Sequence, residues 1–307
     1  MDIGLVMLVK NEVDSVEAAL APILDQLAEV IVYDTGSIDG TQDLLRERLH
    51  IEPVSASLDS ALCGNLASLR NHGFARLNTP WRMTLDADER LAPDGFRALR
   101  ETRIRDEVGG IFLCWRNFLG DSLLFDDYKC PLFRAGLEHF GLVHDTVQPA
   151  LRKAGLRADW SDAVVLEHFP DPHKAPAKRE RSRQRLKCAM LRDPENPRYP
   201  WFYGYGELLR GHGPQAREWL EKAAESQDPR FPVERLNARM ALAAERASHG
   251  AVNETRTQLS LAKTLLAQEK HDFEVAVNRW MGPWLDDSTR MLDEGRPEAI
   301  ELPRFGY

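Results

Sequence analysis

The stretch MTLDADE, residues 83–89, places two aspartates one residue apart at the end of an apolar segment. Successive side chains of a β-strand point to opposite faces, so Asp86 and Asp88 share one side while Ala87 faces away. Like charges this close repel each other unless a cation lies between them. Mg²⁺ or Mn²⁺ binds one or two carboxylates together with substrate phosphate oxygens. The competing interpretation is a solvated acidic turn that begins a helix, so the flanking sequence has to decide.

Three further apolar segments lie upstream, and helical patterns separate them. Residues 3–9 (IGLVMLV) and 30–33 (VIVY) are continuous apolar runs, which are typical of buried parallel strands. A third strand is expected at 51–54, near a sheet edge because Pro53 lacks a backbone donor. The strand that delivers the acid pair is expected at 81–85. Helices are expected at residues 13–27, 43–49 and 66–77.

This alternation predicts a doubly wound, mainly parallel α/β sheet with right-handed crossovers. Ligands of such sheets bind beyond the carboxyl ends of the strands. Three polar clusters fall at those ends, at residues 11–12, 34–39 and 86–88, and we expect them to meet at one edge. Neither a G-x-G-x-x-G nor a G-x-x-x-x-G-K-[ST] motif follows the first strand, which argues against a dinucleotide-binding Rossmann domain and a P-loop enzyme.

Taken together, these clusters resemble the nucleotide-sugar domain of family 2 glycosyltransferases with the GT-A fold. The resemblance is carried by VKNE at 9–12, YDTGSIDGT at 33–41, RN at 70–71 and LDADE at 85–89, in the family's order and spacing. It covers residues 3 to about 100 most strongly. It implies an inverting, metal-dependent transferase that uses Mn²⁺ or Mg²⁺ and takes its sugar from a nucleoside diphosphate sugar, UDP-sugar by default.

The same resemblance assigns roles to individual residues of the donor site. It implies that Asp34 contacts the base or ribose, that Asp39 lies near the base and that Arg70 lies near the donor sugar or diphosphate. It also implies that Asp86 contacts ribose or sugar and that Asp88 ligates the metal. For Asp34 and Asp39 the alternative is turn and helix-capping duty. The other positions implied at the donor site are Val9, Asn11, Glu12, Ser37 and Ala87.

Later segments extend the resemblance toward the catalytic base and the metal. Residues 129–134 (KCPLFR) resemble the family's RLFR strand, and residues 141–145 (GLVHD) resemble its G-x-x-H-E segment. Asp145 is the expected base, and His144 competes with it because imidazole also serves as a base. His168, at the end of a strand expected at 160–169, is a candidate third metal ligand or else a buried structural histidine. As a ligand it would be neutral and would donate its other ring N–H to an acceptor.

The acidic residues 121–127 are expected to form a mobile loop that closes over donor or acceptor. Beyond them, three prolines in residues 170–176 mark a domain boundary, which divides the chain into 1–170 and 171–307. The basic residues 174–192 are either a solvated amphipathic helix or a source of cations, among them Lys178 and Arg181, for the donor diphosphate.

From residue 200 onward the pattern is helical. Gly204, Gly211 and Leu220 sit at the offsets of a tetratricopeptide repeat (TPR) and recur as Ala243, Gly250 and Leu259, 39 residues later. We expect an α-helical TPR-like domain that holds an acceptor peptide on its concave face or forms a homodimer.

Composition narrows the class of protein. The 307 residues are 43% hydrophobic and 29% charged, enough for an ordinary core, and the net charge of −8 gives no global attraction to nucleic acid. Four cysteines without a C-x-x-C favour neither a zinc site nor a disulfide framework, and we expect them reduced in a cytoplasmic protein. No apolar run approaches the length of a membrane span or a signal-peptide core.

The resemblance to family 2 glycosyltransferases implies a transferase that acts on a peptide or a cell-surface glycan. One alternative is a nucleotidyltransferase, which also uses a metal-binding acid pair but usually carries a glycine-rich basic loop after its first strand. The other is a non-catalytic helical-repeat interaction protein with a degenerate transferase domain.

Overall fold

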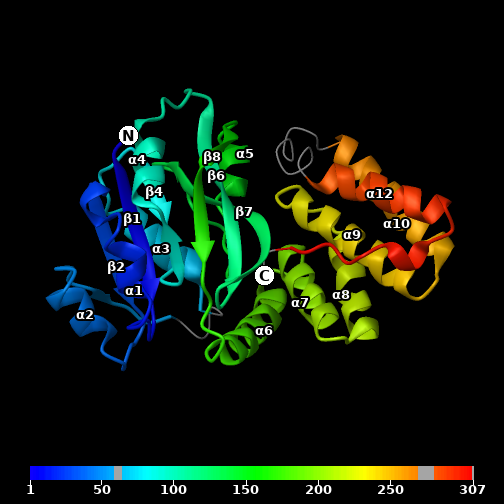
Figure 1. Ribbon diagram of the computed structural model, residues 1–307, viewed down its shortest axis with the longest axis horizontal. Helices are drawn as coiled ribbons and strands as arrows, with labels where there is room; N and C mark the ends of the chain where they lie inside the picture. The colour runs from blue at the N-terminus through cyan, green and yellow to red at the C-terminus, as the bar shows by residue number, and fades with distance from the viewer. Residues whose placement is uncertain (59–63, 269–279, 306–307) are drawn as a thin grey trace. The chain divides into compact units, whose positions relative to one another are not determined.

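The computed structural model describes residues 1–58, 64–268 and 280–305. The chain forms two compact units, Met1–Ser182 and Arg183–Tyr307 (Figure 1). The division falls inside helix α6 (Ala175–Arg192), whose N-terminal part belongs to the first unit. The domain boundary expected at residue 170 stays a prediction.

The first unit is built on an eight-stranded sheet with the order β3-β2-β1-β4-β7-β6-β8-β5. The pairs β1–β2, β1–β4, β2–β3 and β6–β8 are parallel, whereas β4–β7, β6–β7 and β5–β8 are antiparallel. The doubly wound parallel half expected from the sequence is present, and an antiparallel half extends it. The strands are β1 (Ile3–Val9), β2 (Glu29–Asp34), β3 (Val54–Ser55), β4 (Trp81–Thr84), β5 (Glu89–Leu91), β6 (Val108–Leu119), β7 (Ser122–Arg134) and β8 (Arg157–His168).

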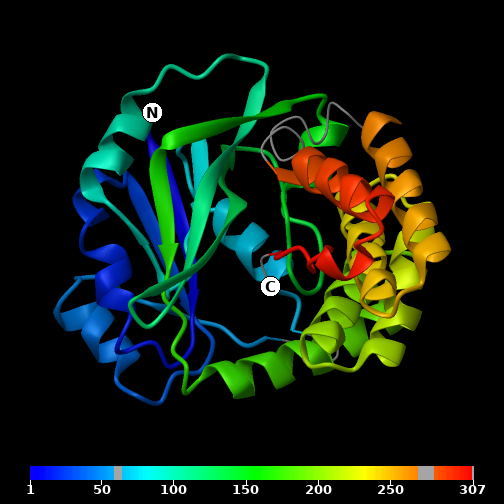
Figure 2. The same ribbon diagram turned by 45° about the vertical axis from the view of Figure 1, so that its right-hand side comes forward.

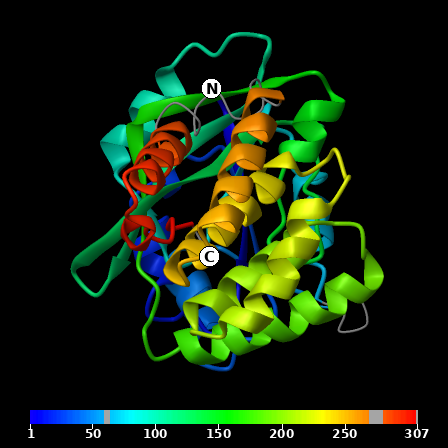
Figure 3. The same ribbon diagram turned by 90° about the vertical axis from the view of Figure 1, so that its right-hand side faces the viewer.

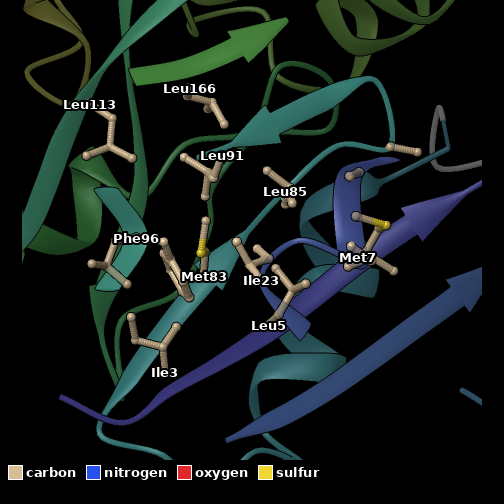
Figure 4. Close-up of a cluster of buried hydrophobic side chains, with 14 of the residues drawn as sticks. Ile3, Leu5, Met7, Ile23, Met83, Leu85, Leu91, Phe96, Leu113 and Leu166 are labelled. Carbon is tan, nitrogen blue, oxygen red and sulfur yellow. The ribbon is translucent and has the colours of Figure 1, made fainter. Parts of the chain in front are cut away.

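One face of this sheet is covered by α1 (Val16–Leu20), α2 (Thr41–Glu47) and α4 (Pro93–Glu101). Alternate residues of β1, namely Ile3, Leu5 and Met7, are fully buried on this face, as the period of a strand requires. Figure 4 shows these three side chains gathered with Ile23, Met83 and Phe96 in one apolar cluster. The 3-10 helix η1 (Leu24–Gln26) follows α1.

The opposite face is covered by α3 (Leu66–Phe74) and α5 (Gln148–Lys153). Val6 of β1 and Phe74 of α3 belong to the core cluster on this side. Helix α3 lies so close to the sheet that a Cβ added at Gly73 would be 2.8 Å from Cγ1 of Val6. The absence of a side chain at Gly73 therefore sets how near α3 comes to β1.

Residues 121–127 differ from their expected mobile loop. All but the turn residue Asp121 belong to β7, which pairs with β6 as a long antiparallel hairpin (Figure 2). Arg116 of β6 donates two hydrogen bonds, of 3.0 and 3.1 Å, to the carboxylate of Asp126 directly across the ladder. Ladder hydrogen bonds and cross-strand ion pairs stabilise the acidic residues as a strand, so their polar composition was a poor guide.

The second unit is helical, as expected. Neighbouring helices along the chain pack side by side, from α7 to α8, α9 and α10 and then to α12 (Figure 3). Gly204 of α7 shows why small residues recur here, because its added Cβ would be 3.0 Å from Cγ of Leu220 in α8. The tetratricopeptide identity of the helices stays a prediction. The elements are α7 (Arg198–Leu209), α8 (Gly213–Glu225), α9 (Pro232–Ser248), α10 (Val252–Gln268), α12 (Gly282–Asp293) and the 3-10 helix η4 (Pro297–Ala299).

Two sequence expectations about composition can be compared with the structure. Cys188 is disulfide-bonded, so the expectation that all cysteines are reduced is wrong for this residue. A disulfide needs two cysteines that are close in space, which their spacing along the chain does not reveal. Within the part of the chain that the structure describes, no helix has the length and apolar character to cross a membrane.

Candidate active site

The loops after β1 and β2 lie together at one edge of the sheet, because the two strands are parallel and Val9 pairs with Asp34. Hydrogen bonds fasten one loop to the other. The backbone N–H of Asn11 donates to Oγ of Ser37 (2.9 Å), and the backbone N–H of Ile38 donates to Oδ1 of Asn11 (2.9 Å). Strand β4 is parallel to β1 as well, so its carboxyl end brings the third predicted cluster to the same edge.

Asp34 and Asp39 make the turn and capping contacts that were the alternative to nucleotide binding. Asp34 is buried; it accepts hydrogen bonds from the backbone N–H (3.1 Å) and Oγ (2.5 Å) of Ser37, and from Nε2 of Gln42. Asp39 accepts from the backbone N–H of Thr41 (3.1 Å) and of Val13 (3.2 Å). These bonds fix the loop. The donor contacts of both residues stay predictions.

Asp86 is held by two cations of the protein. Nη2 of Arg70 donates to its Oδ1 (2.8 Å), and Nζ of Lys129 donates to its Oδ2 (2.9 Å). Lys129 also donates to Oε1 of the fully buried Glu89 (2.7 Å). Burial alone would raise the pKa of Asp86, but Lys129 and Arg70 hold it well below its usual range. Asp86 is thus fixed as a carboxylate.

Arg70 extends this network to the predicted catalytic base. Its Nη1 donates to Oδ1 of Asp145 (2.5 Å), and Nδ1 of His139 lies 2.5 Å from Oδ2 of Asp145. The side chain of Asp145 is only 2% exposed. Nε2 of His144, the other predicted base, lies 3.2 Å from Oγ of Ser182. The backbone of His144 has a positive φ of 52°, a conformation uncommon outside glycine.

Asp88 lies beside His168 and Lys178. Its Oδ2 is 3.5 Å from Nε2 of His168 and accepts a hydrogen bond from Nζ of Lys178 (2.8 Å). Burial would raise the pKa of Asp88, but the hydrogen bond to His168 and the charge of Lys178 hold it at about 2. Nδ1 of His168 lies 2.8 Å from Oδ1 of Asn117, whose Nδ2 donates to the Trp115 carbonyl (3.0 Å). Oδ1 of Asn117 is therefore oriented to accept a hydrogen bond from Nδ1–H of His168.

The residue before α6, Lys174, contacts the loop after β1. Nζ of Lys174 donates to the carbonyl of Asn11 (2.6 Å) and lies 3.7 Å from Oε2 of Glu12. Burial is the main cause of a raised pKa at Glu12. Three other residues predicted at the donor site have the following surroundings. Arg181 is exposed on α6, and Ala87 is buried between Asp86 and Asp88. The carbonyl of Val9 accepts a hydrogen bond from the backbone N–H of Thr35 (2.9 Å).

Asp88 and His168 fit a divalent cation as a two-ligand set. No group of three or more His, Cys, Asp or Glu side chains that could hold a metal occurs in residues 1–58, 64–268 or 280–305. Mg²⁺ and Mn²⁺ sites commonly use one or two protein ligands and complete the shell with phosphate oxygens and water. With Nδ1 of His168 bonded to Asn117, Nε2 is the nitrogen available as a ligand.

A family model described as glycosyl transferase family 2 matches residues 5–146, which hold Asp34, Asp86, Asp88 and Asp145. Residues 5–146 form a family 2 glycosyltransferase domain. A TPR repeat-containing protein of Synechococcus elongatus is 32% identical to the chain over 98 residues, which are 32% of this chain and 23% of that protein. The match therefore spans about a quarter of the relative's length.

Solved structures are similar to the chain in outline. TarS 1–349 of S. aureus, also known in complex with UDP, gives a TM-score of 0.46 at 12% identity, covering 95% of this chain and 92% of that one. Glucosyl-3-phosphoglycerate synthase of Mycobacterium tuberculosis, in complex with Mn²⁺ and UDP-glucose, gives 0.39 at 15% identity, covering 62% and 78%. TM-scores below 0.5 are too low to carry a function from these proteins to this one.

The sequence analysis did not predict three polar residues of this candidate site: Lys129, His139 and Asn117. Lys129 had a signal, because it opens the segment that resembles the RLFR strand. Asn117 had none, because its partner His168 lies 51 residues away and only the folded sheet brings the two together. His139 lies six residues before Asp145, beside the segment that holds the predicted base, but nothing in the sequence indicated its contact with that residue.

Proposed function

We propose that the transferase domain moves a sugar from a nucleoside diphosphate sugar, UDP-sugar by default, to an acceptor with inversion at the anomeric carbon. The observation that carries this proposal is the environment of Asp88. The carboxylate of Asp88 lies in the turn between β4 and β5, and its side chain is 12% exposed. It lies beside Nε2 of His168 (3.5 Å) and beside Lys178, whose side chain is 60% exposed. Such a set suits a divalent cation together with an anionic diphosphate.

The donor would lie across the edge formed by the loops after β1, β2 and β4. In this proposal Asp34 and Asp39 face the base and ribose, and Asp86 faces ribose or sugar. Arg70, Lys178 and Arg181 supply positive charge for the diphosphate. Uracil and ribose offer N–H and O–H donors that carboxylates accept, whereas phosphate oxygens need cations. The backbone around Val9, Asn11, Glu12, Ser37 and Ala87 completes the proposed surface.

Asp88 and His168 would hold Mn²⁺ or Mg²⁺, which when bound neutralises charge on the departing nucleoside diphosphate. Lys178 would leave Asp88 for the diphosphate oxygens. Asp86 keeps its contacts to Arg70 and Lys129, so it orients the sugar or ribose and is not needed as a ligand.

A base must take the proton of the acceptor hydroxyl or thiol as that group attacks the anomeric carbon. Asp145 and His144 are the two residues that the sequence offers for this role. The proposed acceptor is a peptide or a cell-surface glycan held by the TPR-like helices, which are also the proposed surface of a homodimer. A cytoplasmic location completes the proposal.

Thermal unfolding of the full chain with Mn²⁺ and a panel of nucleotides tests this function. We expect UDP to raise the Tm only when Mn²⁺ is present, because binding to the folded state alone stabilises it. At UDP concentrations about 100-fold above Kd the stabilisation is about 2.7 kcal/mol. Asp88→Asn should abolish the shift, whereas Asp94→Asn, an exposed acid on α4, should leave it unchanged.

Other outcomes identify the alternatives. Stabilisation by a nucleoside triphosphate with release of pyrophosphate would indicate a nucleotidyltransferase. A chain that responds to no nucleotide would be the non-catalytic interaction protein.

A further inference from the structure

We infer that Asp145 is a positioning residue, which holds Arg70 against Asp86, and that the role of base belongs to His144. This inference rests on the proposed function, since it assigns a task to a residue of the same donor site. It follows from the geometry around Arg70 and from the way the loop of residues 139–146 presents Asp145.

Arg70 is a bridge between two carboxylates. Its side chain is 12% exposed, and its two terminal nitrogens divide between Asp145 (Nη1, 2.5 Å) and Asp86 (Nη2, 2.8 Å). Among the residues that the structure describes, no hydrogen-bond partner meets the buried Nε of Arg70. The orientation of the guanidinium therefore depends on these two carboxylates. If Asp145 were lost, Nη1 of Arg70 would be left buried without this partner. The guanidinium would then rotate away from its present orientation.

Asp145 is itself held in place from two sides. Its Oδ2 contacts Nδ1 of His139, and the backbone of His139 is clamped by Asn71, which accepts from its N–H (2.8 Å) and donates to its C=O (2.9 Å). Phe140 and Thr146 close the loop with two backbone hydrogen bonds of 2.8 and 2.9 Å. Since Asn71 directly follows Arg70 in α3, one helix turn fixes both ends of the Arg70–Asp145 pair.

The contacts with Arg70 and His139 make Asp145 unsuited to act as the general base. A base needs an oxygen that the acceptor can approach to hydrogen-bonding distance, yet both oxygens of Asp145 are engaged and its side chain is 2% exposed. Burial would raise the pKa of Asp145, but Arg70 and His139 hold it well below its usual range. Such a carboxylate has a low affinity for the acceptor's proton. His144 is next in the chain and is only partly buried.

Binding of UDP to the full chain in the presence of Mn²⁺, measured by titration calorimetry, separates the two roles. A base contributes to the reaction and leaves nucleotide binding unchanged, whereas a residue that positions Arg70 supports binding. Asp145→Asn should weaken UDP binding about tenfold, which corresponds to about 1.4 kcal/mol for one charge-assisted contact. His144→Gln is the matched control and should bind UDP as the unsubstituted protein does.

Slow hydrolysis of a UDP-sugar by water adds a kinetic readout. We expect Asp145→Asn to raise KM for the donor about tenfold and to change kcat by less than about threefold. His144→Gln should lower kcat and leave KM unchanged. In an Arg70→Lys background, Asp145→Asn should cause no further loss of affinity, because the pair acts as one unit.

Asp145→Asn leaves a buried arginine without its carboxylate and could unfold the chain, so Asp145→Glu is tested beside it. Glutamate keeps the charge but moves the carboxylate by one methylene, and we expect UDP binding about threefold weaker. Unchanged UDP affinity in the folded Asp145 variants overturns the inference while the proposed function stands. If the unsubstituted protein binds no nucleoside diphosphate with Mn²⁺, the proposed function fails and the inference fails with it.

Discussion

Asp86 and Asp88 are one residue apart, yet different kinds of cation hold them. Asp86 is bound by Arg70 and Lys129, whose side chains are 12% and 27% exposed. Asp88 is bound by Lys178, whose side chain is 60% exposed and attached to the first turn of α6. A cation with solvent around it can leave at low cost, whereas buried partners cannot. The second aspartate is thus the one whose partner can be exchanged.

Lys178 should therefore compete with a divalent cation for Asp88. Replacing it in Lys178→Ala removes that competitor, and we expect the affinity for Mn²⁺ without nucleotide to increase about tenfold, or about 1.4 kcal/mol. Electron paramagnetic resonance of free Mn²⁺ measures this affinity directly. Arg181→Ala, which removes another exposed cation of α6, is the control and should bind Mn²⁺ as before. Equal affinities in the Lys178 and Arg181 variants would contradict the exchange.

At the scale of elements, the apolar runs located β1, β2 and β4 well, because buried parallel strands have few polar residues. The short strand β5 was missed, since Glu89–Leu91 carries no pattern of its own and pairs with the distant β8. The hairpin of β6 and β7 was missed in part for the same reason. Its acidic residues are stabilised by partners across the ladder, which a local pattern does not contain.

The packing of α3 on β1 gives a test at this scale. Gly73→Ala would place a Cβ 2.8 Å from Cγ1 and 2.9 Å from Cγ2 of Val6, a stiff side chain in the middle of β1. Overpacking costs about 1–3 kcal/mol, against about 1 kcal/mol gained from helix propensity. We expect the free energy of unfolding to fall by about 1 kcal/mol in urea denaturation.

The control for this packing test is Gly213→Ala at the start of α8. The nearest atom to its added Cβ is Oε1 of Glu245 at 3.8 Å, an ordinary contact. The change in stability should stay within about 0.5 kcal/mol. If Gly73→Ala were as harmless as this control, α3 would not be held at the distance that the structure shows.

For the molecule as a whole, the sequence predicted the parallel strands β1, β2 and β4 better than the partners that their side chains contact. Parallel strands bring their carboxyl ends to one edge, so Asp34, Asp86 and Asp88 could be placed together from strand order alone. Two of the cations that hold Asp86 and Asp88 come from distant elements: Lys129 of β7 lies 43 residues from Asp86, and Lys178 of α6 lies 90 residues from Asp88. Those pairings depend on how the sheet and the helix close on each other, which composition and spacing do not encode.

The helical unit carries a buried acid whose protonation should appear in the stability of the whole chain. Glu207 lies 1% exposed in α7 and accepts from Arg183 (2.9 Å), Arg210 (2.7 Å) and His212 (2.7 Å). Burial would raise the pKa of Glu207, but His212, Arg210 and Arg183 hold it at about 2, against 4.5 for an ordinary glutamate. The depressed pKa means that Glu207 stabilises the fold above about pH 4.5.

That stabilisation is lost as the pH falls toward 2, because the unfolded chain binds the proton first. The Glu207→Gln variant lacks this stabilisation. Hydrogen bonds to charged groups contribute about 1.5–3 kcal/mol, so we expect the Tm of the variant at pH 7 to be lower by roughly 3–10 °C than that of the unsubstituted protein. Calorimetry of the full chain between pH 2 and 7 should show the two Tm curves converging below about pH 3. Glu221→Gln, which removes a 44% exposed partner of Arg246, should run parallel to the unsubstituted protein throughout. A constant difference between the Glu207→Gln and unsubstituted curves would mean that Arg183, Arg210 and His212 do not act on an ionised Glu207.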